Sequence, residues 1–418
     1  MPEPVESSSA ENQKPGKVKL RDWILLPLIS LLTIFLLAAA AETTARHLFP
    51  RPKTNELNCL ILNDPSTGVR AVPNSTCVDQ TSESKPVEYK YNSCGHRAGM
   101  ACTVKPPGTF RIVLVGSSFA EGLYVQRDKT FAAVLPAELS RDTGRKIELY
   151  NEGMHWGTPR SVDLRFNQVL AAQPDMILWA LTPFDIQNVS LLLPYIPPSE
   201  LLTKKGAAPA PAGGSQSFFH RTLAVLSSKS IPELARGAWR RVMEGFSDTR
   251  TSFLLQHYLY ESPSQYVKHF LMQGDDAEFL RVNPNPRWQK DLHEFAGYDA
   301  DLEAKAHAAG IPFVVVLLPD RAQAAMISMG QWPDGYDPYK LGEDLRSIVE
   351  GHGGTYVDIL HGYRTIPNPE QHYLAIDGHI DSVGHHIVAD LMAKGLTGGA
   401  VPMLSTTAEP RAVLEAGK

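Results

Sequence analysis

The chain has 418 residues, of which 43% are hydrophobic and 20% are charged, and its formal net charge is −5. This composition is typical of a globular protein with room for one or two packed domains, and it excludes a fibrous, disordered or disulfide-dominated chain. The slight excess of acidic residues gives no electrostatic reason to expect a nucleic-acid partner. The mean hydropathy of −0.18 excludes a protein with many membrane spans, although it leaves room for one.

An apolar segment close to the N-terminus is the first expected element. Residues 24–41 contain no charged side chain and would extend about 27 Å as a helix, close to the thickness of bilayer hydrocarbon. Basic residues precede this segment at Lys14, Lys17, Lys19 and Arg21. We therefore expect a polar cytoplasmic leader over residues 1–22 and a membrane anchor over residues 23–41. A cleaved signal peptide is the main alternative, because small residues occupy 39–41, and a buried helix of a soluble protein is the other.

The four cysteines lie in a segment rich in turn formers, residues 42–108, which follows the apolar segment. An even number of cysteines in one part of an exported chain is typical of disulfides. Proximity along the chain favours the pairs Cys59–Cys77 and Cys94–Cys102 among the three connectivities. A zinc site and free buried thiols are the alternatives, although the segment contains no Cys-x-x-Cys pair.

From residue 109 onward, short apolar runs alternate with helical patterns. The apolar runs predict strands near residues 110–115, 146–153, 174–181, 311–319 and 355–360. Helices are expected near residues 130–139, 160–172, 289–309, 340–352 and 384–394. This alternation predicts the α/β class, with a doubly wound, mostly parallel sheet of five strands.

The alternation is interrupted once. The domain is expected in two parts, 109–190 and 289–397, separated by a mainly helical insertion over residues 191–288 that could cover the site. Within the insertion, residues 203–216 predict a flexible loop, and a capping box at 230–233 predicts a helix start. Residues 398–418 contain little to bury and are expected to form a disordered tail.

Three short blocks stand where ligands gather in open α/β sheets, at the carboxyl ends of expected strands or just before the last helix. The first, residues 116–122 (GSSFAEG), can expose a serine hydroxyl at a strand-to-helix turn. The second, residues 151–153 (NEG), can offer a backbone N–H at a glycine. The third, residues 377–379 (DGH), places a carboxylate where it can orient an imidazole.

Together the three blocks resemble those of the SGNH/GDSL hydrolase family, over roughly residues 90–190 and 290–396. The resemblance implies a serine nucleophile at Ser118, a general base at His379 and an aspartate partner at Asp377. It also implies that the backbone N–H groups of Ser118 and Gly153 stabilise the oxyanion.

Two details are similar to a particular branch of that family. The spacing Asp-x-His looks like the variant found in membrane-anchored members related to alginate O-acetylation factors. The lead-in motif, residues 92–97 (NSCGHR), resembles the Asn-x-x-Gly-x-Arg sequence that precedes the first block in those members.

Two positions depart from the family pattern. Ser117 stands in place of an aspartate, and Phe184 stands in place of the asparagine that donates to the oxyanion. Loss of one oxyanion donor typically lowers the rate by about a hundred- to a thousand-fold. Thr182, Asn188 or a group from the insertion could supply the missing donor.

Other polar residues near the blocks suggest weaker hypotheses. His155 and Trp156 could form a wall for a sugar, or they could simply pack. Neither a metal ion nor another cofactor is expected, because His379, His385 and His386 lack a carboxylate at a usual ligand spacing.

The predicted protein is a single-pass component of a bacterial inner membrane whose catalytic domain lies outside the cytoplasm. The resemblance implies a serine esterase or acyltransferase that acts on O-acyl esters, above all acetyl esters, of an envelope polysaccharide. The expected partners are an acylated carbohydrate, the membrane and envelope polysaccharide machinery. The alternatives are an inactive glycan-binding or assembly subunit on the same fold, suggested by Phe184, and a purely structural envelope protein.

Overall fold

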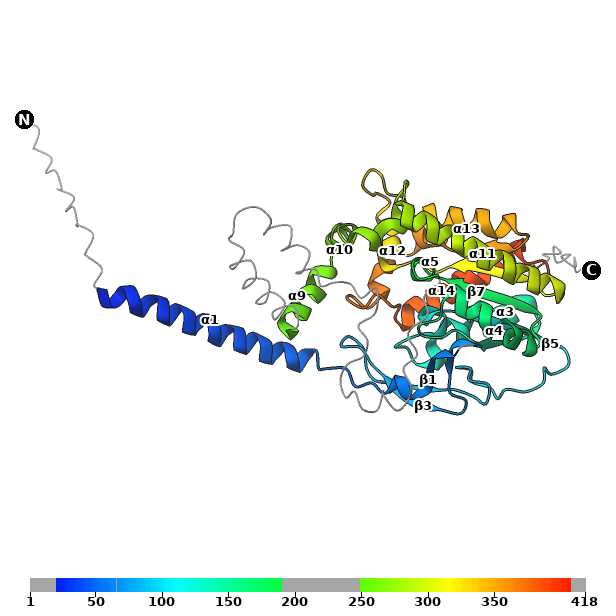
Figure 1. Ribbon diagram of the computed structural model, residues 1–418, viewed down its shortest axis with the longest axis horizontal. Coiled ribbons are helices and arrows are strands. Elements are labelled where there is room, and N and C mark those ends of the chain that lie inside the picture. Colours follow the sequence, from blue (N-terminus) through cyan, green and yellow to red (C-terminus); the bar gives the residue numbers. More distant parts are fainter. Residues whose placement is uncertain (1–19, 65, 190–248, 407–418) are drawn as a thin grey trace, which may run out of the picture.

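The computed structural model describes residues 20–64, 66–189 and 249–406. A single long helix, α1 (Leu20–Leu48), projects from the body of the protein (Figure 1). Its apolar side chains are exposed, and by length and composition the part from Leu25 to Leu48 could cross a membrane. The helix continues past the predicted end at residue 41, and Glu42 and Arg46 form an ion pair in its last turns.

After α1, the cysteine-bearing segment forms a small N-terminal lobe of two antiparallel hairpins. Its elements are η1 (Glu56–Cys59), β1 (Leu60–Asp64), β2 (Gly68–Ala71), β3 (Thr76–Asp79) and β4 (Val87–Lys90). The lobe buries its own apolar cluster, and both expected disulfides, Cys59–Cys77 and Cys94–Cys102, are confirmed. The sequence did not predict these strands, because runs of four or five residues between turn formers show no clear alternation.

The main sheet has five parallel strands in the order β6-β5-β7-β8-β9. The strands are β5 (Thr109–Gly116), β6 (Lys146–Asn151), β7 (Met176–Leu181), β8 (Phe313–Leu317) and β9 (Thr355–Val357). Every residue of β5, β7 and β8 is buried, which explains why these segments are nearly continuous apolar runs. The predicted five-stranded parallel sheet is confirmed.

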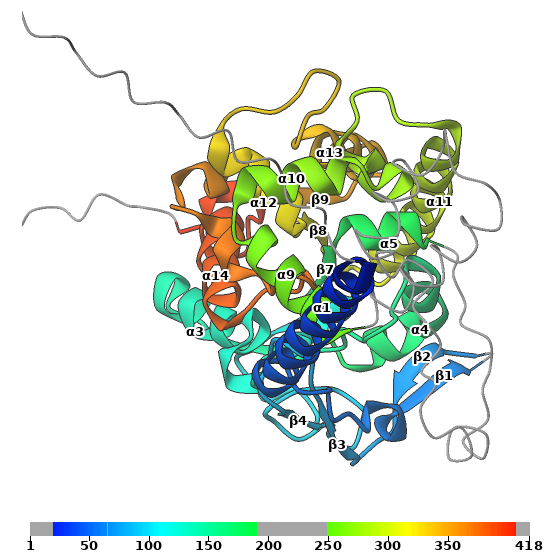
Figure 2. The same ribbon diagram turned by 90° about the vertical axis from the view of Figure 1, so that its left-hand side faces the viewer.

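Helices cover both faces of this sheet, as the predicted doubly wound class requires. On one face α3 (Phe131–Thr143) packs against α14 (Ser382–Gly395) (Figure 2). On the other, α11 (Pro286–Ala308) packs against both α4 (Pro159–Ala171) and α13 (Lys340–Gly351). Short elements complete the domain: α2 (Ser118–Glu121), η2 (Arg127–Lys129), α5 (Pro183–Gln187), α12 (Arg321–Met329), η4 (Leu360–Thr365) and η5 (Pro369–His372).

The described part of the insertion is helical, as expected. It contains α9 (Arg250–Tyr260), α10 (Pro263–Leu271) and η3 (Gly274–Leu280). Helix α9 lies against the end of α1, and α10 packs on α12 (Figure 2). The predicted loop over 203–216 and the predicted helix start at 230–233 lie outside the described residues.

The beginning of the expected disordered tail is ordered, so that prediction is wrong for residues 398–406. The element η6 (Leu396–Ala400) extends the last helix, and Val401 and Leu404 are then buried in the main core. These two apolar side chains pack this segment against the core, but two residues are too few to form a recognisable hydrophobic pattern in the sequence.

Candidate active site

Ser118 lies at the first position of α2, immediately after β5 ends. The chain turns sharply at Gly116, whose φ is 149°. A Cβ atom at this glycine would lie 2.3 Å from the carbonyl oxygen of Ala180 on the neighbouring strand, so no larger residue fits. The turn places the Ser118 hydroxyl at the carboxyl edge of the sheet, where ligands gather in this fold.

The structure brings together the three side chains expected to act as nucleophile, base and aspartate partner. The Nε2 atom of His379 lies 2.7 Å from Ser118 Oγ. Its Nδ1 atom lies 2.6 Å from Asp377 Oδ1. Although burial alone would raise the pKa of Asp377, the adjacent His379 holds that pKa below its ordinary value. A charged carboxylate therefore fixes the ring with Nε2 directed at the hydroxyl.

The segment that carries Asp377 and His379 is a tight loop between η5 and α14. An antiparallel bridge between Tyr373 and Ile380 closes it, and the N–H of Leu374 donates to the carbonyl of His379 at 2.8 Å. Gly378 has φ of 89°, in the left-handed region that favours glycine. This conformation explains the glycine in Asp-x-His and brings both side chains to the same side of the loop.

Glu83, from the N-terminal lobe, holds this loop by its backbone. Its carboxylate accepts hydrogen bonds from the N–H groups of Ile376 and Asp377, each with a 3.0 Å contact. The Glu83 side chain is only 3% exposed, and it also contacts His257 Nδ1 on α9 at 2.9 Å. Sequence reasoning missed Glu83, because its partners are 293 and 294 positions away along the chain.

A buried arginine on α12 also holds this loop. Arg321 donates to the carbonyl groups of Glu370 and Ala375, and also to Tyr260 at the end of α9. Two aromatic rings then flank the imidazole of His379: Phe119 with its centroid at 4.8 Å, and Tyr124 at 5.5 Å and nearly perpendicular. Neither Arg321 nor these rings was singled out from the sequence.

Ser117, at the position of the family's aspartate, belongs to a buried network below the nucleophile. Its hydroxyl donates to Asp185 Oδ2 at 3.1 Å, and the same oxygen accepts from the N–H and the hydroxyl of Thr182 at 2.7 Å. Burial raises the pKa of Asp185 to about 6 despite these hydrogen bonds. The network joins the end of β5 to the start of α5.

The expected oxyanion donors other than Ser118 are engaged elsewhere in this structure. The N–H of Gly153 donates to Asn151 Oδ1 at 2.8 Å. The Thr182 hydroxyl donates to Asp185, and the Asn188 amide donates to the carbonyl of Phe184 at 3.0 Å. In this structure these three groups make local contacts in turns and at a helix end, and their expected roles toward the substrate stay predictions. At the first position of α2, the N–H of Ser118 has no partner within its own helix.

The lead-in motif, residues 92–97, contacts the end of α2 through Arg97. The guanidinium of Arg97 is buried and donates to the carbonyl groups of Glu121, Gly122 and Val125, at 2.6–2.9 Å. Because these carbonyls terminate α2 and its following turn, the motif helps to fix the segment that carries Ser118.

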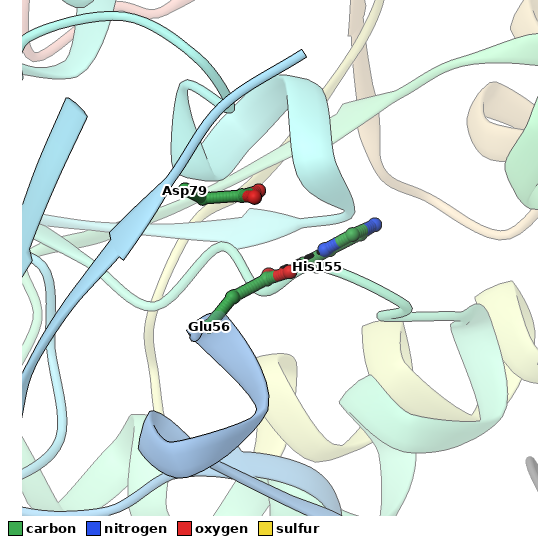
Figure 3. A group of neighbouring side chains, drawn as sticks. All are labelled: Glu56, Asp79 and His155. Carbon is green, nitrogen blue, oxygen red and sulfur yellow. Dashed lines mark hydrogen bonds and ion pairs between the residues drawn. The ribbon is translucent and has the colours of Figure 1, made fainter. Parts of the chain in front are cut away.

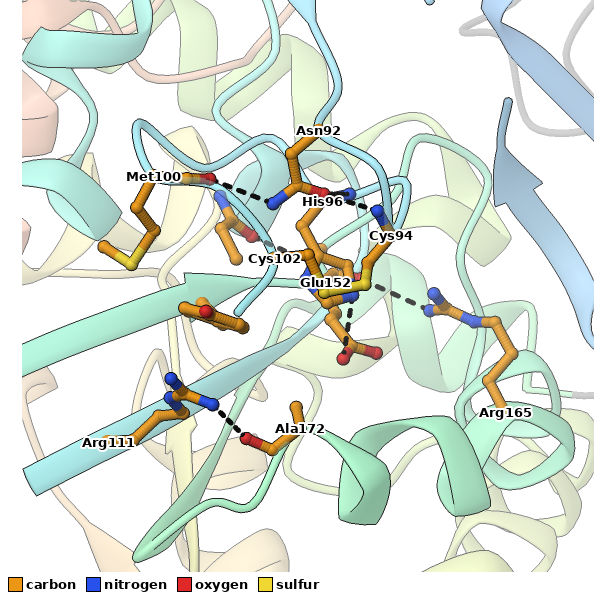
Figure 4. A network of polar contacts seen from close by, with 12 residues as sticks. Asn92, Cys94, His96, Met100, Cys102, Arg111, Glu152, Arg165 and Ala172 are labelled. Carbon is orange, nitrogen blue, oxygen red and sulfur yellow. Dashed lines mark hydrogen bonds and ion pairs between the residues drawn. A yellow bond between two sulfur atoms is a disulfide. The ribbon is translucent and has the colours of Figure 1, made fainter. Parts of the chain in front are cut away.

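The first residue of the motif organises its own turn. Asn92 Oδ1 accepts from the N–H groups of Cys94 and His96 at 2.9 and 3.0 Å (Figure 4). His96 then contacts Glu152 in the second block, with Nε2 3.1 Å from Oε1. The motif therefore connects the turn that carries the Cys94–Cys102 disulfide to the loop after β6.

His155 and Trp156 lie at the boundary between the N-terminal lobe and the sheet domain. Their rings are stacked, with centroids 4.5 Å apart. His155 Nδ1 lies 2.5 Å from Glu56 Oε1, with Asp79 close by (Figure 3). Burial opposes the charged form of His155, but Glu56 outweighs it and raises the pKa of the imidazole to about 9. The Nδ1 atom of His155 is thus directed at a carboxylate of the lobe, and a role of His155 and Trp156 in binding a sugar stays a prediction.

His385 lines the last helix, as expected, and faces inward. Its ring is fully buried, and Nδ1 accepts a hydrogen bond from the N–H of Phe131 at 3.2 Å. Burial lowers the pKa of this imidazole to about 3, so it is neutral and joins α14 to the start of α3.

The fold and this site define a class: parallel α/β proteins with a serine, a histidine and an aspartate in hydrogen-bonding contact at the carboxyl edge of the sheet. No family model matches the sequence, and no curated protein does. Among solved structures, the chain is similar to LAE5, an α/β hydrolase enzyme from the metagenome of Lake Arreo, Spain, with 15% identity, a TM-score of 0.35 and coverage of 71% of this chain and 97% of that one.

Two further solved structures have comparable similarity. A catalytic mutant of Axe2, an acetylxylan esterase from Geobacillus stearothermophilus, has 12% identity and a TM-score of 0.35, covering 70% of this chain and 96% of that one. A lipolytic protein of the G-D-S-L family from Desulfitobacterium hafniense has 12% identity and a TM-score of 0.30, covering 68% and 99%.

Proposed function

We propose that this protein is an SGNH/GDSL-type serine hydrolase or acyltransferase. The observation that carries the proposal is the unbroken chain of contacts from Ser118 Oγ through both nitrogens of His379 to Asp377. The strand order, the position of the serine after β5 and the position of the Asp-x-His loop before α14 support the same assignment. The first two blocks follow β5 and β6, whose carboxyl ends lie at one edge of the sheet, and the loop before α14 brings the third block to the same edge.

The proposed reaction is acyl transfer through a covalent serine. His379 Nε2 accepts the proton of Ser118 Oγ as this oxygen attacks the ester carbonyl. Asp377 stabilises the imidazolium that forms. In the proposed reaction the N–H of Ser118, which has no partner within α2, donates to the oxyanion, and His379 then returns the proton to the leaving alcohol. The acyl group passes from the serine to water or to a sugar hydroxyl.

The proposed substrate is an O-acetylated carbohydrate of the cell envelope. The Asp-x-His spacing and the lead-in motif, which resemble those of the anchored branch of the family, support this choice. The exposed apolar helix α1 and the two disulfides are typical of a membrane-anchored domain in an oxidising compartment. We therefore propose a single-pass protein with residues 42–418 on the extracytoplasmic side.

Covalent labelling tests the nucleophile directly. The full chain in detergent is treated with a fluorophosphonate probe, and the labelled peptide is identified by mass spectrometry. Labelling is expected on Ser118, absent in Ser118→Ala and retained in Ser117→Ala, because Ser117 faces Asp185 and not His379. A folded wild-type protein that takes no label contradicts the proposal.

A second candidate function is a non-catalytic glycan-binding subunit on the same fold. Phe184 and the engaged N–H of Gly153 favour it, since a site with one oxyanion donor is a weak catalyst. Binding of an acetylated oligosaccharide that is unaffected by Ser118→Ala, together with no labelling, would select this candidate.

For the anchor, resistance of the membrane-bound protein to carbonate extraction is expected, whereas a mature chain that starts near Glu42 would indicate a signal peptide.

A further inference from the structure

Three metal-ligating side chains from distant parts of the chain meet outside the catalytic contacts. Glu56 begins η1, Asp79 ends β3, and His155 lies in the loop after β6. One ligand atom from each residue lies within 4.8 Å of the others (Figure 3). Both carboxylate residues are buried, at 6% and 4% exposure. The cluster therefore lies inside the boundary between the N-terminal lobe and the sheet domain.

One oxygen of the cluster has no partner. Asp79 Oδ1 accepts the N–H of Gln80 at 2.8 Å, whereas the buried Oδ2 makes no hydrogen bond with the described residues. Figure 3 shows this carboxylate directed toward His155 and Glu56. A buried carboxylate oxygen without a partner is unfavourable unless a cation or a hydrogen-bond donor compensates it.

The surroundings add further negative charge. The fully buried Glu121 accepts the N–H of His155 at 2.8 Å and a hydrogen bond from the hydroxyl of Tyr91. The carboxyl groups of Glu56, Asp79 and Glu121 thus share a region with the guanidinium of Arg97 and the imidazole of His155. A divalent cation would balance this charge.

We propose that Glu56, Asp79 and His155 bind a zinc ion. Zn²⁺ takes imidazole nitrogen and carboxylate oxygen as ligands, and one imidazole, two carboxylates and a water molecule would complete its tetrahedral shell. Calcium is a poor match, because it prefers six to eight oxygen ligands, and magnesium prefers oxygen in an octahedron. The ion would replace the direct contact between His155 Nδ1 and Glu56 Oε1, and Asp79 Oδ2 would gain its missing partner.

The ion would act as a structural clamp. Glu56 and Asp79 belong to the N-terminal lobe, whereas His155 follows the second block, two residues beyond Gly153. Zinc would therefore fasten the lobe to the loop that borders the nucleophile. This role is additional to the proposed acyl transfer, because none of the three ligands makes a hydrogen bond with Ser118 or His379.

Metal content and thermal stability of the untagged full chain in detergent test the site. After EDTA treatment and gel filtration, the protein is incubated with ZnCl₂ and desalted, and zinc is measured by mass spectrometry. About one equivalent is expected for wild type, with a higher Tm than the EDTA-treated protein. Asp79→Asn preserves the shape of the side chain and is expected to lose most of this zinc. Glu88→Gln, at an exposed position on the adjacent strand β4, is the matched control and is expected to retain it.

Two additional measurements keep the test decisive. Zinc X-ray absorption of the wild type is expected to report a single imidazole among oxygen ligands, even if Asp79→Asn does not fold. A shell of several imidazoles would assign the ion to surface histidines and overturn the proposal, as would wild type that binds no zinc or folded Asp79→Asn that binds one equivalent. Ser118→Ala protein is expected to keep its zinc, so the metal site and the proposed acyl transfer can fail independently.

Discussion

The two halves of the candidate site are built in different ways. The nucleophile half consists of a buried strand and a short helix, and Ser118 is fixed by the turn at Gly116 and the carbonyl contacts of Arg97. The base half is a loop with little regular structure, and it depends on side chains from elsewhere, chiefly Glu83 and Arg321. Changes to the second half should therefore disturb catalysis without disturbing the core.

The largest expected effect comes from removing a reacting group. His379→Gln should lower kcat for hydrolysis of an activated acetyl ester by about a thousand-fold or more, because the base that accepts the serine proton is lost. Steady-state kinetics on the full chain in detergent measure this effect. His361→Gln, at an exposed histidine outside the site, is the matched control and should leave kcat unchanged. Retained activity in His379→Gln would assign the base elsewhere.

The next effect separates the two halves. Glu83→Ala removes the acceptor for two N–H groups of the base loop, and kcat should fall by about ten- to a hundred-fold, since small displacements of a base are costly. KM should change little. Glu83→Gln, which keeps an accepting oxygen, should recover part of kcat.

A comparison of kcat with Tm distinguishes a positioning role of Glu83 from a general loss of protein stability. If Glu83→Ala and Glu83→Gln lower the Tm equally and leave kcat at the wild-type value, the loop does not depend on Glu83. Glu88→Gln, on the exposed surface of the same lobe, should match wild type in both measurements.

Removing a disulfide should affect stability more than chemistry. The Cys59–Cys77 bond closes a separation of 18 residues and the Cys94–Cys102 bond one of 8, so the chain-entropy model gives about 3 and 2.5 kcal/mol. The double variant Cys59→Ser/Cys77→Ser should therefore unfold at a lower denaturant concentration than the double variant Cys94→Ser/Cys102→Ser. Equal midpoints, or a larger loss from the shorter loop, would show that the lobe is stabilised by other contacts.

The smallest expected effect concerns the nucleophile half and is a pH dependence. Burial raises the pKa of Asp185 to about 6, so the folded state binds the proton more tightly than the unfolded state, and this group's contribution to stability falls as the pH rises through about 6. Between about pH 5 and pH 7.5 the loss is about 1 kcal/mol. Urea unfolding of Asp185→Asn should show a profile that lacks this decline. Parallel profiles for the variant and the wild type would contradict the assignment.

Local patterns in the sequence were sufficient for much of the fold. The alternation of apolar runs with helical patterns predicted β5 to β9. The runs are most continuous in β5, β7 and β8, because a strand buried on both faces has few polar positions. The proximity of the cysteines predicted both disulfides, and the three blocks predicted which side chains meet at the sheet edge. The short strands of the lobe and the buried Val401 and Leu404 were missed, since so few residues form no periodic pattern.

What the sequence determined by itself is thus which side chains meet at the edge of the sheet: a serine after the first strand of the sheet, and an aspartate and a histidine before the last helix. Only the tertiary structure decided what surrounds them. In the folded chain the N–H of Gly153 donates to Asn151, and Glu83 accepts hydrogen bonds from the loop that carries the base. Glu56, Asp79 and His155 also come together. Several of these contacts join residues far apart in the chain. Buried hydrogen-bonding and charged groups need partners, and a local sequence pattern does not indicate which distant residue provides the partner.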